Sequence, residues 1–188
     1  MAYLKRHIDA QLQEWKDSPR RKPLLIRGAR QVGKSTAVRE FGKSFRHFME
    51  INLERQPDLR QLFTENIDVK ATCDNLSGTL HIPIIPGETL LFIDEIQVCK
   101  EAIMALRYFK EDYPELHVIA AGSLLEFALE ELPSFGVGRI RSLYMYPFSF
   151  DEFLMAQGLE MSISYKSKAT SESPLPELAH KKIGRAHV

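Results

Sequence analysis

The clearest structural signal in this chain is the segment LLIRGARQVGKST, residues 24–36. It opens with LLIR, an apolar run with the character of a short buried strand. The residues that follow match the pattern G-x-x-x-x-G-K-[ST] in full: Gly28, Ala29, Arg30, Gln31, Val32, Gly33, Lys34 and Ser35. An apolar stripe at helical spacing comes next, formed by Val38, Phe41 and Phe45. A strand, a glycine-rich loop and a helix in this order predict a phosphate-binding loop.

The residue types of this loop suit a chain of phosphates. Backbone N–H groups must wrap the phosphates closely, so side chains are absent at the tight points, which Gly28 and Gly33 provide. The helix from about Lys34 presents unpaired N–H groups and the positive end of its dipole. We expect Lys34 to bind the β and γ phosphates, Ser35 to offer its hydroxyl to Mg²⁺, and Thr36 to bond the α-phosphate. The alternative, a glycine turn with a solvated lysine, leaves the full motif unexplained.

A second motif, LLFIDEIQ at residues 90–97, narrows the chemistry. Its apolar run ends in Asp94, which predicts an acid at the carboxyl end of a strand, the edge where parallel α/β sheets bind ligands. We expect Asp94 to hold Mg²⁺ through its water shell. Glu95 is expected near the γ-phosphate, where a carboxylate can orient and polarise an attacking water, which favours hydrolysis over transfer to a substrate. The alternative is that both acids cap the next helix on the surface.

Strands and helices alternate along the rest of the chain. Strands are predicted at residues 24–27, 48–53, 90–94, 116–121 and 140–146. Helices are predicted at residues 4–16, from the glycine loop onward, around Ile103, Leu106 and Phe109, and from the capping box of Ser149 and Glu152 through Leu154. This alternation predicts an α/β fold with a mainly parallel sheet that is covered on both faces.

The length of 188 residues allows one α/β domain of ordinary size. We expect a leading amphipathic helix at residues 1–18, the core at residues 19–157, and a tail at residues 158–188. The tail is rich in Ser, Lys and Pro and is expected to be mostly disordered. Its last letters, IGRAHV, match the translation of a common sequencing adapter, so we expect the native protein to continue beyond this point.

Composition limits the possible partners. Lys plus Arg number 25 and Asp plus Glu number 25, so there is no global positive field for nucleic acid or an anionic membrane. The best local candidate for a nucleic-acid contact is Arg20, Arg21 and Lys22, which read equally as a solvated turn. No apolar run is long enough to span a membrane, and the N-terminus is too polar for a signal peptide. The only cysteines, Cys73 and Cys99, favour a reducing cytoplasm.

Together these segments resemble the AAA-type P-loop NTPases that carry an adjacent catalytic glutamate. They look most like a group of largely uncharacterised prokaryotic AAA-domain ATPases, whose loop reads like GxRQVGKT and whose second motif reads like LLFIDEIQ. The resemblance extends from the leading helix with Trp15 to PFSFDEFL at residues 147–154. It implies a three-layer P-loop core with five parallel strands in the order 5-1-4-3-2. It also implies ATP as the nucleotide. This inference rests on the resemblance alone, because no single residue here identifies the base.

The resemblance implies two further site residues. Ser123 occupies the place of a polar sensor at the end of the fourth strand, although Ser123 and Glu126 also form a capping-box pattern. AAA enzymes use an arginine that stabilises transition-state charge, often from a neighbouring subunit, and Arg139 is our candidate. The loop glycines Gly136 and Gly138 would let it approach a phosphate, whereas the alternative is an exposed turn with solvated arginines.

The leading hypothesis is therefore Mg-dependent ATP hydrolysis coupled to a conformational change, with Glu95 and Lys34 as central residues. A homo-oligomer or a partner protein bound through a missing C-terminal region would fit this role. The alternative is a nucleotide-dependent switch with negligible turnover, because no helical lid is recognisable in the sequence. A P-loop kinase or a helicase is a weaker hypothesis, since neither an arginine-rich acceptor lid nor a helicase motif set is visible.

Overall fold

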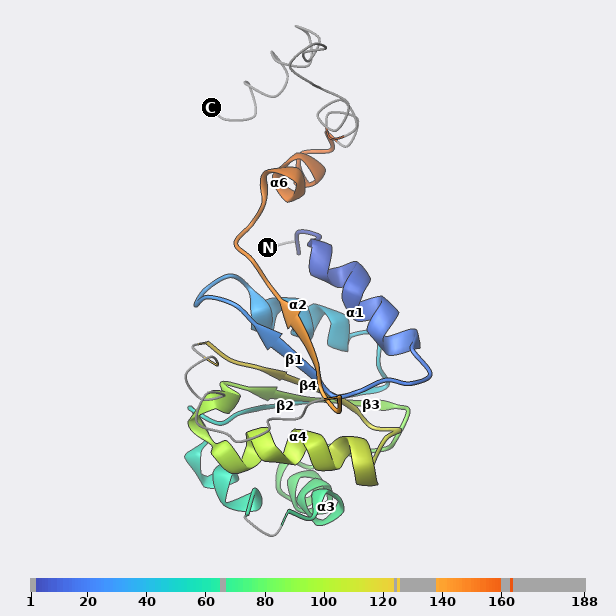
Figure 1. Ribbon diagram of the computed structural model, residues 1–188, viewed down its shortest axis with the longest axis vertical. Helices are drawn as coiled ribbons and strands as arrows, with labels where there is room; N and C mark the ends of the chain where they lie inside the picture. The colour runs from blue at the N-terminus through green and yellow to red at the C-terminus, as the bar shows by residue number, and fades with distance from the viewer. Residues whose placement is uncertain (1–2, 65–66, 124, 126–137, 160–162, 164–188) are drawn as a thin grey trace, which may run out of the picture. The chain divides into compact units, whose positions relative to one another are not determined.

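The computed structural model describes residues 3–64, 67–123, 125, 138–159 and 163 (Figure 1). The helices and strands are, in chain order, α1 (His7–Asp17), β1 (Leu24–Arg27), α2 (Lys34–Gly42), β2 (His47–Asn52), the 3₁₀ helix η1 (Pro57–Leu62), α3 (Val69–Leu80), β3 (Thr89–Asp94), the 3₁₀ helix η2 (Ile96–Val98), α4 (Lys100–Asp112), β4 (His117–Ala121), β5 (Arg141–Tyr144) and α6 (Phe150–Ala156). The chain divides into two compact units, one of Met1–His7 with Phe148–Val188 and one of Ile8–Pro147.

The larger unit contains a five-stranded sheet with the order β2-β3-β4-β1-β5, in which every pairing is parallel. Read from the other edge, this is the order 5-1-4-3-2, so the predicted α/β fold and strand order are confirmed. β4, which comes late in the chain, pairs with β1 and separates it from β3. The carboxyl end of β1 therefore lies between the ends of β4 and β5, with the end of β3 one strand further away.

Helices cover both faces of the sheet, with α1 and α2 on one face and α3 and α4 on the other (Figure 1). Successive strand residues point to opposite faces, so a strand in a sheet that is covered on both faces buries all of its side chains. All residues of β3 are buried in this way. Leu91 and Ile93 join the core cluster shared with α3 and α4. Phe92 is oriented toward the other face, where its ring stacks on Phe48 at 6.4 Å.

Trp15 anchors α1 to this second face. This residue is 1% exposed, and its ring lies 6.3 Å from that of Phe41 in α2. Its indole Nε1 donates a hydrogen bond to the carbonyl of Lys22 at 2.7 Å. Arg21 lies over the same ring and donates to the backbone carbonyls of Lys16 and Glu115. Part of the basic segment before β1 thus serves packing, while a contact with nucleic acid there stays a prediction.

The predicted boundaries differ most from the structure at α1 and β5, and by one or two residues at other elements. α1 begins at His7 rather than at residue 4, and Leu4 is 49% exposed, so the apolar stripe that defines the helix starts only at Ile8. β5 spans Arg141–Tyr144 rather than residues 140–146, because the final bond to β1, from Met145 N to Arg27 O, is followed by an exposed tyrosine and a proline.

The smaller unit is organised around Glu152 of α6. Ser149 caps the helix in a reciprocal capping box with Glu152, as the sequence predicts. The Glu152 carboxylate also accepts from the backbone N of His7 at 2.8 Å and pairs with Arg6 at 3.0 Å. Although burial of the carboxyl acts in the other direction, these hydrogen bonds and the arginine lower its pKa to about 2.

Several expectations fall outside the described residues. Most of the 158–188 tail, including its IGRAHV end, is not among them, and neither are Glu126 and Gly136. Within the described part of the chain, no helix is long and apolar enough to cross a membrane. Cys73 and Cys99 are both buried free thiols, and burial raises the pKa of the Cys73 thiol to about 12.

Candidate functional site

The phosphate-binding motif forms the turn between β1 and α2, and its first glycine is required by a close contact. Gly28 has a φ of 140°, and a Cβ atom there would lie 2.1 Å from the carbonyl oxygen of Met145. That carbonyl follows β5, whose backbone pairs with β1 as far as Met145 N. No side chain fits between the two strands at this point. Gln31 and Gly33 also have positive φ, of 62° and 96°, and they complete the tight turn.

Lys34 points back across this loop. Its Nζ donates to the carbonyl oxygens of Gly28 at 2.8 Å and Ala29 at 2.7 Å, and the residue is 8% exposed. Burial lowers the pKa of the ammonium, while the negative charges of Glu95 and Asp94 act to raise it. A buried cation with carboxylates nearby is positioned to neutralise a phosphate group.

The N-terminus of α2 lacks a side-chain cap. Gly33 is the N-cap residue in a left-handed conformation, no side chain bonds to the first-turn amides, and the first turn carries no acid. α3 differs, since the Asp68 carboxylate accepts from the backbone N of Lys70 and Ala71. The amides at the start of α2 are therefore open to an anionic ligand at the positive end of the helix dipole.

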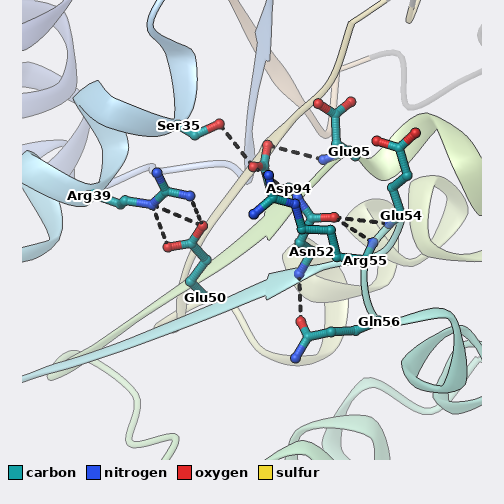
Figure 2. Close-up of polar contacts among 9 residues, drawn as sticks. All are labelled: Ser35, Arg39, Glu50, Asn52, Glu54, Arg55, Gln56, Asp94 and Glu95. Atoms are coloured by element: carbon teal, nitrogen blue, oxygen red, sulfur yellow. Dashed lines mark hydrogen bonds and ion pairs between the residues drawn. The ribbon is translucent and has the colours of Figure 1, made fainter.

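Ser35 and Asp94 meet although they lie far apart in the sequence. The Ser35 hydroxyl donates to Oδ2 of Asp94 at 2.9 Å, as Figure 2 shows. Asp94 ends β3 and is 4% exposed, and this burial raises the pKa of its carboxyl, whereas the bond from Ser35 lowers it. A buried carboxylate beside a hydroxyl would gain from a bound cation.

These two oxygens fit a magnesium ion. A hydroxyl and a carboxylate are oxygen donors of the kind that Mg²⁺ prefers, and the two groups lie within hydrogen-bond distance of each other, so they could hold the ion together, Asp94 through its water shell. Among the residues that the structure describes, no group of three or more His, Cys, Asp or Glu could hold a metal. Phosphate and water oxygens would have to supply the remaining ligands, as is usual for Mg²⁺ at nucleotide sites.

Glu95 follows Asp94 with a sharp change of backbone direction, at φ 51° and ψ 43°. Its backbone N donates to Oδ1 of Asp94 at 3.1 Å, and its carboxylate points away from that of Asp94 (Figure 2). Oε2 of Glu95 accepts from the side-chain Nε2 of Gln97 at 2.6 Å and has Ser123 Oγ at 3.5 Å. The two acids of the motif are thus held by different partners.

The start of α2, the two acids and Ser123 line one cavity of about 440 Å³, a volume typical of small-ligand sites. Its lining residues are Arg30, Gln31, Gly33, Lys34, Ser35, Thr36, Arg39, Asn52, Glu54, Arg55, Asp94, Glu95 and Ser123. Cationic side chains and helix amides therefore share the cavity with a carboxylate pair. This combination can hold a polyphosphate with a divalent cation and place a carboxylate beside it.

The family model of an AAA domain matches residues 20–154. The chain belongs to this family. The membership indicates a nucleotide-binding, ATPase-type domain. None of the curated proteins matches the chain.

Asn52 is a residue of the AAA domain site that the sequence motifs do not identify. It ends β2, and its Nδ2 donates to Oδ2 of Asp94 at 3.3 Å. Its Oδ1 accepts from the backbone N of Glu54 and Arg55, while its own N donates to Gln56 (Figure 2). An asparagine at the carboxyl end of a predicted strand is the signal that could have identified it.

Arg39 also lines the cavity of the AAA domain and lies outside the predicted set. Its guanidinium bonds both carboxylate oxygens of Glu50, at distances of 2.6 to 3.1 Å. This pair links α2 to β2 beside Asp94 (Figure 2). The hydrogen bond to Glu50 raises the pKa of Arg39, burial acts in the other direction, and the negative charges of Glu50 and Asp94 add to the increase.

Arg139 is not brought to the site of its own AAA domain. It precedes β5 and therefore lies at the amino edge of the sheet, whereas Lys34 and Asp94 lie at the carboxyl edge. Its guanidinium forms an ion pair with Glu111 near the end of α4. Action on a neighbouring subunit stays a prediction. Ser123, in contrast, follows β4 and lines the cavity at 2% exposure.

Proposed function

We propose that this AAA domain binds ATP with Mg²⁺ and hydrolyses it. The observation that carries the proposal is the position of Glu95, whose carboxylate lines the same cavity as Lys34 and the start of α2. A domain that only bound nucleotide would need the phosphate loop but not a second acid placed beside it. A carboxylate in this position can accept a proton from an attacking water.

Each of the other residues has a defined part in this proposal. Lys34 and the free amides of α2 bind the phosphates and stabilise negative charge that develops during hydrolysis. Ser35 and Asp94 would hold Mg²⁺, which supplies charge neutralisation between the phosphates. Glu95 orients the water by the carboxylate oxygen that Gln97 does not engage. Thr36 is proposed to bond the α-phosphate from the first turn of α2.

The proposal is tested by Glu95→Gln, which keeps the shape of the side chain but removes the base. Phosphate release is expected to fall by about 100-fold or more, while the Kd for Mg-ATP stays within a factor of two or so of the wild-type value. Phosphate release and fluorescent-nucleotide binding measure the two quantities. Removal of Mg²⁺ with EDTA is expected to stop turnover in the wild-type chain.

Glu88→Gln is the matched control, because Glu88 precedes β3 at the opposite edge of the sheet and pairs with Arg46 at 2.9 Å. Its turnover should equal that of the wild type. Unchanged hydrolysis in Glu95→Gln would refute the assignment. Tight nucleotide binding with no turnover in the wild-type chain would instead favour the nucleotide-dependent switch.

A further inference from the structure

Gln97, the last residue of the LLFIDEIQ motif, donates a short hydrogen bond of 2.6 Å from its side-chain Nε2 to Oε2 of Glu95. A carboxylate is an acceptor only, so the amide must present its N–H group to it. The bond engages Oε2 and leaves the other oxygen, Oε1, for a different partner. An amide that holds one oxygen of a reactive carboxylate fixes the direction of the second oxygen.

The backbone brings the two side chains together. Glu95 is in a left-handed conformation, and η2 begins at the next residue, Ile96. Ile96 is fully buried and anchors the turn in the core shared with α3 and α4. Glu95 and Gln97 therefore leave the turn on the same side, toward the end of β4.

Gln97 is a poor choice for stability alone. Its Oε1 is buried and has no hydrogen-bond partner among the described residues, which is an unfavourable state for a polar atom. Methionine has a similar length and would fill the space without this penalty. The one hydrogen bond that the amide makes within the described residues, to Glu95, is the contact that can offset this penalty.

Gly122 provides the space for this amide. A Cβ atom at Gly122 would lie 2.1 Å from Oε1 of Gln97 and 3.1 Å from a carbon of Leu125. The backbone at Gly122 is not in the left-handed region, so alanine is allowed there by conformation. The glycine therefore serves the glutamine side chain and not a turn.

We propose that Gln97 is a positioning residue for Glu95, and that Gly122 maintains the space in which the Gln97 amide holds the carboxylate. This inference rests on the proposed hydrolysis of ATP by Glu95. Gln97 itself contacts neither nucleotide nor water in this role; it acts through the orientation of the Glu95 carboxylate.

The first test is Gln97→Met in the full chain. The value of kcat is expected to fall about 10- to 100-fold, as for other partners that orient a reactive group. The Kd for Mg-ATP should stay unchanged, and the Tm should equal or exceed that of the wild type because the unpaired oxygen is gone. An unchanged kcat, or a loss confined to nucleotide affinity, would overturn the proposal.

Gly122→Ala tests the same contact without removing the amide, because its methyl group displaces the Gln97 side chain. It should lower kcat by a similar factor in the wild-type background. In Gln97→Ala the methyl group meets no amide and only its contact with Leu125 remains, so adding Gly122→Ala should not lower kcat further. If the two substitutions each lower kcat and the two factors multiply in the Gln97→Ala, Gly122→Ala double variant, the proposal is contradicted.

A spectroscopic test separates this inference from the proposed function. The side-chain amide resonances of Gln97 should shift strongly in Glu95→Ala and only slightly in Glu88→Gln, whether or not the protein hydrolyses ATP. If the wild type shows no turnover but the resonances respond, the hydrolysis proposal fails and the Gln97–Glu95 contact stands. If the resonances do not respond to Glu95→Ala, the positioning role is refuted even in an active enzyme.

Discussion

Gly28 and Gly33 occupy the two glycine positions of one motif for different physical reasons. Gly33 is the left-handed N-cap that leaves the first amides of α2 open. Gly28 is required because the Met145 carbonyl lies where its Cβ atom would be. The sequence pattern predicts that both glycines serve phosphate binding. The close contact between Gly28 and Met145 instead belongs to the packing of β1 against the segment after β5.

Gly28→Ala is therefore expected to destabilise the protein even without nucleotide. Both the positive φ and the overlap with Met145 oppose the new side chain, with a loss of about 2–5 kcal/mol in the free energy of unfolding. Urea unfolding followed by circular dichroism measures it. Gly78→Ala is the control: Gly78 lies in α3 with nothing within 4 Å of its Cβ position, and alanine should stabilise the helix by about 0.5–1 kcal/mol. A loss of similar size in both variants would contradict the packing argument.

The site residues divide according to how local their signals are. Lys34 and Ser35 are predictable because strand, loop and helix are consecutive, so the motif itself brings them to one turn. Asn52 is not predicted, because its contact with Asp94 forms only when β2 and β3 pair. Gln97 is not predicted either, because its contact with Glu95 depends on the left-handed backbone of Glu95 before η2. Gln97 was visible within its motif, but no spacing rule assigns it a partner.

β4 begins at His117, a buried residue whose ring packs against aromatic side chains of the helical layer on this face of the sheet. The His117 ring lies 4.8 Å from that of Phe45 and 5.8 Å from that of Trp15, at near-perpendicular angles. Burial lowers the pKa of His117 to about 4, and the positive charges of Arg21 and Lys16 act in the same direction. The imidazole is therefore neutral in the folded protein at neutral pH.

The stability of the fold should consequently decrease on mild acidification. Between pH 6.5 and about 4 the unfolded chain binds a proton at His117 that the folded chain does not, so the folded state loses stability as the pH falls. One such proton gives a slope of at most about 1.4 kcal/mol per pH unit. Urea unfolding at a series of pH values measures this slope.

His117→Phe should flatten that part of the pH profile while keeping the ring contacts. His81→Asn is a suitable control, because His81 is the exposed left-handed C-cap of α3, a conformation that asparagine tolerates. An equal slope in His117→Phe and in the wild type would show that another group causes the acid sensitivity.

The elements themselves were predicted with uneven success. β1 and β3 are confirmed closely, because apolar runs that end at a glycine or an acid leave little choice of boundary. α3 is not singled out by the sequence patterns. Its buried residues Val69, Thr72, Cys73 and Leu76 follow helical spacing, yet two of them are not strongly apolar, and Gly78 weakens the helix signal. Packing against α4 and the Asp68 cap compensate for this.

In the molecule as a whole, the candidate nucleotide site and Arg139 lie at opposite edges of the sheet. An arginine at the amino edge cannot reach the phosphates of its own chain, so any catalytic role requires a second subunit. This separation leaves two possibilities: an arginine whose role is its ion pair with Glu111, or an arginine supplied in trans.

Subunit mixing tests the arrangement in trans. Arg139→Ala and Glu95→Gln should each be inactive alone, whereas their mixture should regain up to about a quarter of the wild-type rate, because some Arg139→Ala subunits then border an intact arginine. Phosphate release at several mixing ratios measures the recovery. Arg107→Ala is the control, since Arg107 pairs with the same Glu111 carboxylate from within α4. Full activity of Arg139→Ala alone would exclude the arginine from catalysis.

The two buried thiols have a practical consequence for such experiments. Cys73 and Cys99 are 2% and 5% exposed, and the raised pKa of Cys73 keeps its thiol protonated. Because the thiolate is the reactive species, maleimide dyes should leave both natural cysteines unmodified in the folded protein. A single cysteine introduced on an exposed helix position can therefore carry a fluorophore in an otherwise unaltered sequence, and energy transfer between labelled chains would report assembly directly.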